Sequence, residues 1–325
     1  TSAEQTGPLN IVPLSDTTFT DSTVPLAGSE IFYYVRAVDH EGAESAVSAK
    51  TGPVDIATAF PHIRTIGDTG ASAGIFDIPT GLVVVDSLIY VVDQGKKCVT
   101  VVDTAGEVVR SFGQQVPALP VEAAVVDSEL YVADDDNGCG IAVFDLAGNH
   151  SRTLRPDARG PERILDVAVP GDRTIYVVDG VDMCVARLDS AGREIARSTM
   201  VMQSPIKVAV CGGTVYVADE QACSVYTLDH RLAASTDVFS MAPALYGTRR
   251  TTLYALACSP DSLVWAAVTA ECTALHAVDP DGSRVAKTVL PRQTEAVRMV
   301  NDLFVTEDHV YCLTNDKVIE ILQRP

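Results

Sequence analysis

The chain has 325 residues, 47% of them hydrophobic, and a formal net charge of −19 from 43 acidic against 24 basic side chains. This length and apolar content allow a large buried core in one or two domains. Nucleic acids and anionic membrane surfaces are bound through clustered Lys and Arg, so neither is an expected partner. Membrane insertion is excluded too, because the strongest apolar stretch, Leu82–Val92, contains Asp86 and is too short to span a bilayer.

Residues 1–55 differ in character from the rest of the chain. The run from Ile31 to Val38 alternates in the manner of a β-strand. With the flanking segments 18–21 and 44–48, it resembles the second half of a fibronectin type III module. A whole module needs about 100 residues for its two sheets, so the resemblance implies a partial β-sandwich. Either the missing strands lie upstream in a longer chain, or another protein chain completes the sandwich.

A repeat follows, in which an aromatic residue is succeeded by two apolar residues and usually Asp, once every 40 to 49 residues. Its six aromatic positions are Tyr90, Tyr131, Tyr176, Tyr216, Trp265 and Tyr311. Apolar runs and Gly-containing turns on either side make each copy a four-stranded antiparallel meander. Short strands at even spacing are typical of propeller blades. Residues 56–325 are therefore predicted to form an all-β, six-bladed β-propeller.

The ring is expected to close with a strand from the start of the repeat region. The sixth copy ends after its third strand, at Val318–Leu322, while a spare strand, Pro61–Ile66, precedes the first copy. Pairing these two segments would complete the last blade and remove a free sheet edge.

The first copy also carries a recognisable set of motifs. They are Ile63–Gly67, Pro79–Leu82, Tyr90–Asp93 and Ser111–Gly113. With these motifs the copy resembles an NHL repeat, and the resemblance extends over residues 60–325, weakening in the last two copies. It implies a six-bladed propeller of a family used mainly to bind protein, RNA or ligands, in which a few relatives are lyases or lactonases.

The start of the first strand in each blade is expected to face the mouth of the central channel. Alignment of the copies places there Gly81, Glu122, Asp166, Lys207, Tyr254 and Asp302, with Asn301 beside the last. Carboxylates from several blades can hold a hard cation such as Ca²⁺, so Glu122, Asp166 and Asp302 form a candidate divalent-metal site. In the related lactonases, acids and an amide at similar places hold a catalytic metal. The alternative is a polar ring in a water-filled channel, in which Lys207 neutralises one acid.

Other polar residues have simpler interpretations. The repeated Asp93, Asp134, Asp179 and Asp219 are predicted to cap turns through side-chain-to-backbone hydrogen bonds. The acidic loop 134–137 lacks the spaced ligands of a calcium-binding loop. No His begins an inner strand, so a zinc site built from three His, as in the peptide-amidating lyase propellers, is not expected.

Cysteines recur at the start of the third strand. These five, predicted to be small buried apolar residues, are Cys98, Cys139, Cys184, Cys223 and Cys272. Cys211 and Cys258 lie near the hairpin turns of adjacent blades, where a disulfide between blades could form.

Two adhesive module types, an acidic surface and no visible catalytic motif predict an exported, non-catalytic scaffold or binding protein. It would be extracellular or periplasmic and would present a propeller face to a protein, glycan or small ligand within a larger assembly. The alternative is a metal-dependent hydrolase or lyase that uses Glu122, Asp166 and Asp302 at the channel mouth.

Overall fold

The computed structural model of the chain describes residues 30–31, 54–55, 60–67, 74–135, 140–157, 160–200, 202–240, 252–269, 273–280, 284–289 and 299–324. The chain divides into two compact units, residues 1–58 and 59–325. In the first unit, β1 (Glu30–Ile31) pairs antiparallel with β2 (Val54–Asp55). The rest of the predicted fibronectin-like segment lies outside the described residues and stays a prediction.

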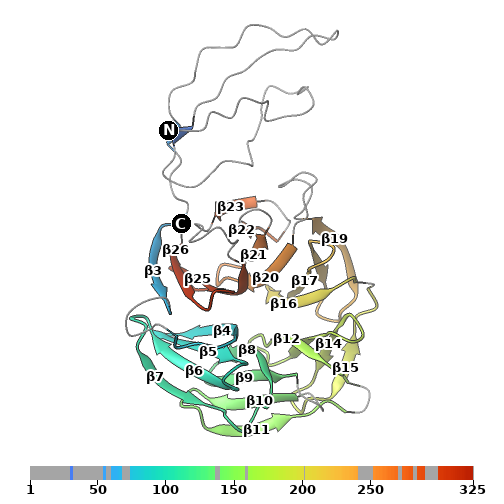
Figure 1. Cartoon of the computed structure of the whole chain (residues 1–325). Coiled ribbons are helices and arrows are strands. Elements are labelled where there is room, and N and C mark those ends of the chain that lie inside the picture. Colours follow the sequence, from blue (N-terminus) through green and yellow to red (C-terminus); the bar gives the residue numbers. More distant parts are fainter. Residues whose placement is uncertain are drawn as a thin grey trace, which may run out of the picture. The chain divides into compact units, whose positions relative to one another are not determined.

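The second unit consists of six four-stranded antiparallel sheets, each forming one blade of a propeller (Figure 1). Blades 1 to 3 are β4 (Pro79–Val85), β5 (Leu88–Asp93), β6 (Cys98–Asp103), β7 (Val108–Phe112); β8 (Pro120–Val126), β9 (Glu129–Asp134), β10 (Gly140–Asp145), β11 (His150–Leu154); and β12 (Ile164–Ala168), β13 (Ile175–Asp179), β14 (Cys184–Leu188), β15 (Glu194–Arg197). Blades 4 to 6 are β16 (Pro205–Cys211), β17 (Thr214–Asp219), β18 (Ser224–Leu228), β19 (Ala234–Ser240); β20 (Thr252–Cys258), β21 (Val264–Thr269), β22 (Thr273–Val278), β23 (Arg284–Val289); and β24 (Val300–Val305), β25 (His309–Thr314), β26 (Ile319–Gln323), β3 (His62–Ile66).

The first strand of each blade forms the inner wall of the ring. Each of these inner strands contacts the next one, and β24 of blade 6 contacts β4 of blade 1, so the ring is closed. The predicted six-bladed, all-β propeller is therefore confirmed. Within the described residues there are strands, turns and bends, and no helix that could cross a membrane.

The predicted closing strand is also confirmed. In blade 6, β3 pairs antiparallel with β26, so that Ile66 lies opposite Ile319 and Thr65 lies opposite Glu320. Just before β3, the buried Phe60 ring packs against Trp265 of blade 5, with ring centroids 5.4 Å apart. Residues from the start of the unit thus complete both the last sheet and the core beside it.

The core lies between blades, which explains the continuous apolar runs of the second strands. In β5, Val91 and Val92 point to opposite faces of the sheet, and both are fully buried. Val91 packs in the cluster shared with blade 6, and Val92 packs with Leu130 of blade 2. A blade alone would leave both of these faces in water, so the sheets are stable only as neighbours in the ring.

The repeated aspartates hold the loops at one end of the blades. The Asp93 carboxylate accepts backbone N–H bonds from Asp77 at 2.8 Å, Ile78 at 3.0 Å and Lys96 at 3.0 Å. It therefore caps the following turn and also fixes the segment that leads into β4. Asp134, Asp179 and Asp219 also accept backbone N–H bonds in their own blades. The predicted capping of the following turn is confirmed for Asp93, Asp179 and Asp219, whereas most of the turn after Asp134 lies outside the described residues.

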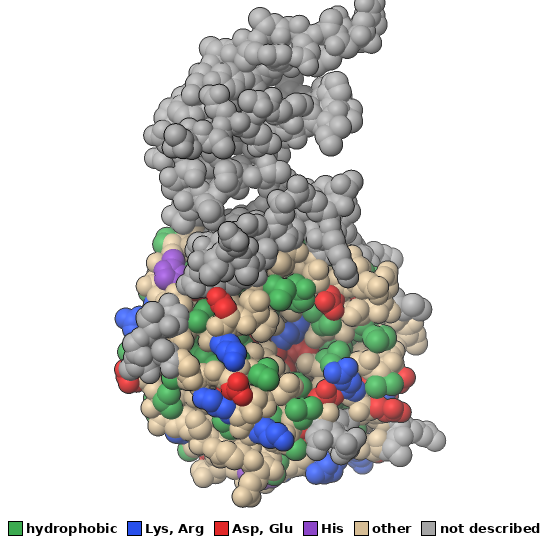
Figure 2. All heavy atoms as spheres, viewed as in Figure 1, with side chains coloured by type: hydrophobic (Ala, Val, Ile, Leu, Met, Phe, Trp, Pro, Cys, Tyr) green, Lys and Arg blue, Asp and Glu red, His purple; other side chains and the backbone are tan. Residues whose placement is uncertain are grey.

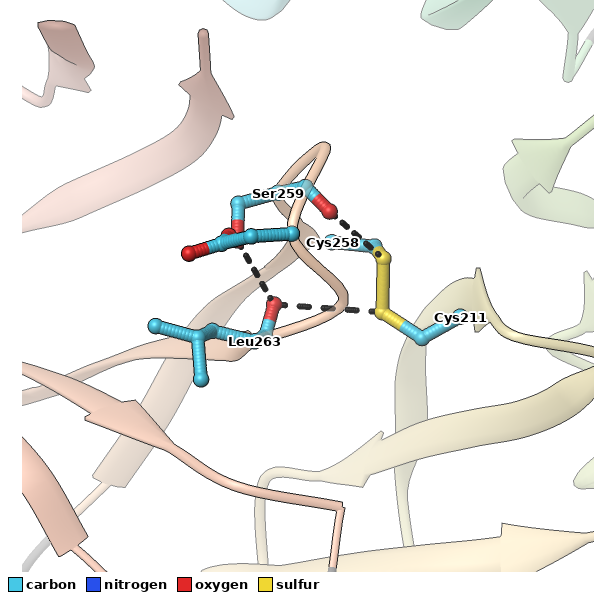
Figure 3. The surroundings of a disulfide bond; sticks show 5 residues. Cys211, Cys258, Ser259 and Leu263 are labelled. Carbon is cyan, nitrogen blue, oxygen red and sulfur yellow. Dashed lines mark hydrogen bonds between the residues drawn. A yellow bond between two sulfur atoms is a disulfide. The ribbon is translucent and has the colours of Figure 1, made fainter. Parts of the chain in front are cut away.

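The described cysteines occupy the places that the repeat predicts. Cys98, Cys184 and Cys223 are buried at the start of their third strands, whereas Cys139 and Cys272 lie outside the described residues. Cys211 at the end of β16 forms a disulfide with Cys258 at the end of β20, with a Cα–Cα distance of 5.7 Å. Figure 3 shows this bond beside the β20–β21 turn. It links the inner strands of blades 4 and 5, as the sequence allowed.

Candidate functional site

Each inner strand shifts its register near its start. In blade 1, Pro79 lies opposite Asp93 and Gly81 lies opposite Val92, so Thr80 is an inserted residue of the kind found in a β-bulge. The same shift occurs in all six blades, and the inserted residues, all half-buried, are Thr80, Val121, Leu165, Ile206, Tyr254 and Asn301. The residues that follow them, all buried, are Gly81, Glu122, Asp166, Lys207, Ala255 and Asp302. We call this second set the axial ring.

The axial ring differs from the predicted alignment in blade 5. There Leu253 pairs with Val268 and Ala255 pairs with Ala267, so Tyr254 is the inserted residue and Ala255 takes the axial place. An apolar strand gives no sequence signal for such an insertion, and an error of one residue exchanges the two faces of a strand. Asn301 is likewise an inserted residue, next to the axial Asp302.

Four charged side chains of the axial ring form one buried cluster. The Lys207 ammonium group donates a hydrogen bond to Asp302 Oδ1 at 3.0 Å and lies 3.8 Å from Asp166 Oδ1. It also contacts Glu122 Oε2 directly. All four residues are at most 7% exposed. Three carboxylates from blades 2, 3 and 6 therefore surround one ammonium group from blade 4.

Each carboxylate uses its second oxygen to bind a backbone N–H group. Asp302 Oδ2 accepts a bond from Leu82 N at 2.8 Å, and Asp166 Oδ2 accepts one from Val208 N at 2.5 Å. Glu122 Oε1 accepts a bond from Ala123 N at 2.9 Å. The first two bonds join neighbouring blades. The cluster is consequently held in place by the backbone of the ring itself.

Glycine at position 81 makes room for Glu122. A Cβ atom built on Gly81 would lie 1.9 Å from Glu122 Oε1 and 2.6 Å from the carboxyl carbon. Any other residue would therefore push the Glu122 carboxylate away from its present position. Because Gly81 of blade 1 has no side chain, the Glu122 carboxylate of blade 2 can extend into the cluster.

Burial and mutual charge control protonation in the cluster. Burial raises the pKa of Glu122 well above its usual value, and the nearby Asp302 adds to the effect. Burial raises the pKa of Asp166 to about 7, although Lys207 opposes the shift. Burial lowers the pKa of Lys207, but Asp302, Glu122 and Asp166 outweigh this and keep it well above its ordinary value. The ammonium group of Lys207 stays charged, while the carboxyl groups of Glu122 and Asp166 hold a proton at unusually high pH.

The predicted metal ligands do come together, but around a lysine. The ammonium group of Lys207 stands where the carboxylates of Glu122, Asp166 and Asp302 converge, so a divalent ion bound by all three would have to displace it. Among the described residues, no group of three or more His, Cys, Asp or Glu side chains is arranged to hold a metal ion. A Ca²⁺ site here stays a prediction, and the acidic loop 134–137 lies partly outside the described residues.

The visible face of the propeller carries no large region of one charge. Figure 2 shows acidic, basic and hydrophobic side chains interspersed over the described surface in that view. The net charge is therefore not concentrated in one patch on this face.

Comparisons with known proteins place the fold next to a group of enzymes. No family model matches the chain, and no curated protein matches its sequence. Selenomethionine-substituted virginiamycin B lyase from Staphylococcus aureus is similar in structure, with a TM-score of 0.54 and 9% identity over 75% of this chain and 94% of that one. A catalytically inactive variant of the same lyase with quinupristin gives a TM-score of 0.58 and 8% identity over 77% and 96%. A streptogramin B lyase gives a TM-score of 0.53 and 10% identity over 75% and 82%.

These neighbours correct the functional prediction from the sequence. The expected non-catalytic scaffold or binding protein is contradicted, because the similar solved structures are those of lyases. The lack of a recognisable catalytic motif was the weak step in that prediction, since propeller enzymes can assemble a site from single residues on separate blades. At such low identity the likeness itself shows the propeller fold. The NHL and fibronectin resemblances stay predictions.

Proposed function

We propose that this chain is an enzyme of the lyase or hydrolase class whose proton-transfer site is the axial cluster of Glu122, Asp166, Lys207 and Asp302. The observation that carries the proposal is the convergence of three buried carboxyl groups on one buried ammonium group. Similar propellers that are lyases support the choice of reaction class.

The cluster contains groups suited to opposite roles in proton transfer. Because its pKa is raised to about 7, the Asp166 carboxyl group can both accept and release a proton near neutral pH, as a general base requires. Lys207 keeps its positive charge and can stabilise negative charge that develops on the substrate. Glu122, with a pKa raised by burial and by Asp302, can retain a proton and act as the acid.

The same arrangement serves two reactions. In an elimination, Asp166 would take a proton from carbon while the leaving group departs and receives a proton from Glu122. In a hydrolysis, Asp166 would take a proton from water as the water oxygen attacks, and Glu122 would again protonate the leaving group. In both reactions, Asp166 and Glu122 return to their starting protonation states once one proton passes through solvent from Asp166 to Glu122.

A substrate would approach the cluster past the six inserted residues. Each lies next to an axial position and is half-buried, and Val121, Leu165 and Ile206 are aliphatic. Tyr254 adds an aromatic ring in blade 5. Apolar groups next to the reactive centre of the substrate would match these side chains.

The test uses quinupristin as the first probe, because a structural neighbour was crystallised with it. Elimination leaves the summed mass of the products equal to that of the substrate, whereas hydrolysis adds one water, so mass spectrometry separates the two reactions. We expect Asp166→Asn to lower kcat about 10²–10⁴-fold, the usual contribution of a general base. Lys207→Met should also lower kcat, since it removes the stabilising charge.

Asp145→Asn is the matched control. Asp145 ends β10, where its carboxylate accepts hydrogen bonds from the backbone N–H and the side chain of Asn149, and β9 separates β10 from the inner strand β8. This variant should keep the wild-type rate. Equal rates for Asp166→Asn, Lys207→Met and Asp145→Asn would overturn the assignment of the site. A wild-type protein that converts neither quinupristin nor simpler esters and lactones would overturn the proposed reaction class.

We also propose that the protein is exported. The Cys211–Cys258 disulfide supports this, since such bonds persist in oxidising compartments. Thiol quantification on protein taken directly from its source, before and after a reductant, tests the idea. For residues 1–55, a partner chain that completes the fibronectin-like segment remains part of the same proposal.

A further inference from the structure

The six inserted residues of the inner strands form two chemically different halves of a ring. In three consecutive blades they are aliphatic, and in the other three they carry a hydroxyl or an amide group. The first set, the aliphatic arc, is Val121, Leu165 and Ile206 of blades 2, 3 and 4, and the second set, the polar arc, is Tyr254, Asn301 and Thr80 of blades 5, 6 and 1. Because the closed ring makes blades 6 and 1 neighbours, each arc is continuous.

Each inserted residue lies beside the axial residue of its own blade. In blade 3, Leu165 packs in the core shared with blade 4, and the carboxylate of the next residue, Asp166, binds Val208 N of blade 4. Both side chains therefore face the same neighbouring blade. Since all six blades share this register shift, the aliphatic arc adjoins the proposed acid, base and ammonium group. The polar arc adjoins the axial residues of blades 5, 6 and 1.

The polar arc has hydrogen-bonding groups that the fold itself does not use. Within the part of the chain that the structure describes, neither the Asn301 amide nor the Tyr254 hydroxyl forms a hydrogen bond, and both residues are half-buried. The Thr80 hydroxyl makes one long hydrogen bond, to Val92 O at 3.5 Å. An amide group can both donate and accept, and a phenol can donate. A ligand that brings an amide or a hydroxyl group to this arc gains contacts that a purely apolar ligand does not make.

We propose that the two arcs determine the orientation of the substrate, with an apolar group against the aliphatic arc and an amide or hydroxyl group against the polar arc. The inference rests on the proposed function, because the aliphatic arc adjoins the groups that carry out the reaction. Val121 directly precedes Glu122, the proposed acid, so the leaving group lies against Val121. Since no inserted side chain is charged, the part of the substrate that contacts the arcs is uncharged.

Two anilides, N-acetylglycine anilide and pentananilide, form a matched pair of probes. They share the aromatic group and the chain length, and only the first carries an inner amide group in place of two methylene groups. Anilides resist hydrolysis, so calorimetry of the full chain measures their binding apart from turnover. Asn301→Leu and Tyr254→Phe should each raise the Kd of the first anilide about three- to tenfold, the range for one hydrogen bond, and leave that of the second within about twofold. Val121→Thr should raise both Kd values by the same factor, because the aromatic group that the probes share lies against Val121.

Gln221→Leu is the matched control. Gln221 is exposed in the turn after β17, and the end of β17 lies beside the start of β16, so this amide is at the same end of blade 4 as Ile206. The variant should leave both Kd values unchanged. Equal changes for the two anilides in Asn301→Leu and Tyr254→Phe would overturn the polar arc, even in an active enzyme. A wild-type protein that binds neither anilide would overturn the orientation as well, whereas the rates of the axial-cluster variants decide the proposed function separately.

Discussion

The axial-ring position is a glycine in blade 1 and a glutamate in blade 2. Gly81 and Glu122 occupy equivalent positions in adjacent blades, and the Glu122 carboxylate fills the space that a side chain at position 81 would need. Because Glu122 is bound to Ala123 N and to Lys207, it cannot move aside without losing both contacts. Glu122 can therefore keep this position only because residue 81 has no side chain.

Gly81→Ala should destabilise the protein by about 1–3 kcal/mol, the usual cost of inserting a methyl group into a packed interior. The added methyl would displace the Glu122 carboxylate from its backbone donor. Urea denaturation followed by circular dichroism measures the change. Gly171→Ala is the control, because nothing lies within 4 Å of a Cβ atom at Gly171, and it should cost no stability. Equal midpoints for the two variants would contradict the packing argument.

Single residues also mark the limit of prediction from the sequence. The alignment identified Glu122, Asp166, Lys207 and Asp302 because charged residues interrupt apolar strands at equivalent places. It missed Ala255 because an inserted residue shifts the register there, and Tyr254 and Ala255 are both compatible with an apolar strand. The central position of Lys207 depends on side-chain reach across the axis, which spacing along the chain does not reveal.

At the scale of elements, β3 is the piece on which ring closure depends. It covers the edge of β26, and Ile66 at its end is 1% exposed. Glu320 of β26 is buried as well and accepts hydrogen bonds from His62 and Thr65 of β3, each at 2.7 Å. An unpaired β26 would leave this carboxylate and a row of backbone groups without these partners.

Two truncations separate the roles of the chain's two units. Removing residues 1–58 should leave the unfolding of the propeller unchanged, because Phe60 and β3 remain. Removing residues 1–66 should lower the free energy of unfolding by at least about 4 kcal/mol, since the burial of Phe60 and Ile66 is lost. Urea denaturation and size-exclusion chromatography measure the outcome. If both truncations unfold at the same urea concentration, β3 does not stabilise the ring.

The Cys211–Cys258 disulfide should act on stability through the unfolded chain. It joins residues 47 apart in sequence, and closing a loop of that length typically adds about 2–4 kcal/mol. Dithiothreitol should therefore lower the urea midpoint of the wild type and have no effect on the Cys211→Ala/Cys258→Ala variant. An equal response of both proteins to the reductant would mean that the bond does not contribute.

The sequence predicted the strands and their connections more accurately than it predicted the function of the protein. The missing fourth strand of the last copy indicated which segment had to close the ring, and the hairpin-turn positions of Cys211 and Cys258 were compatible with a cross-blade bond. Both follow from strand order and spacing, which a repeat displays directly. The function could not be obtained in this way, because the axial residues are single positions on four blades and form no contiguous motif.

At the scale of the whole molecule, the axial cluster joins the blades as well as filling the axis. Its carboxylates come from blades 2, 3 and 6 and its ammonium group from blade 4, and two carboxylates bind the backbone of a neighbouring blade. Taking charges out of water costs free energy that their pairing only partly offsets. The protonation state of this cluster should therefore be visible in the stability of the entire ring.

The free energy of unfolding should fall as pH rises from about 4 to about 7, and Asp166 should account for part of the fall. Its pKa is raised from 3.8 to about 7, mainly by burial. The folded chain thus holds a proton that the unfolded chain has already lost, so the stability contributed by this group is fully present below pH 3.8 and is lost as pH passes about 7. At about 1.4 kcal/mol per pKa unit, the loss is at most about 4 kcal/mol. Lys207, with its pKa raised above 10.5, has its effect only in alkali and leaves this window unchanged.

Urea denaturation at a series of pH values, with wild type and Asp166→Asn compared at each, isolates this contribution. The asparagine cannot ionise, so its curve should be flatter between pH 4 and pH 7. Asp145→Asn again serves as the control. Hydrogen bonds from Asn149 lower the pKa of Asp145, so the stability that this carboxylate contributes is lost as pH falls. Ionisation of Asp145 therefore cannot cause a loss of stability as pH rises. If the wild-type and Asp166→Asn curves run parallel through this window, Asp166 does not take up a proton there, and neither the cluster's effect on ring stability nor its proposed role as the base can stand.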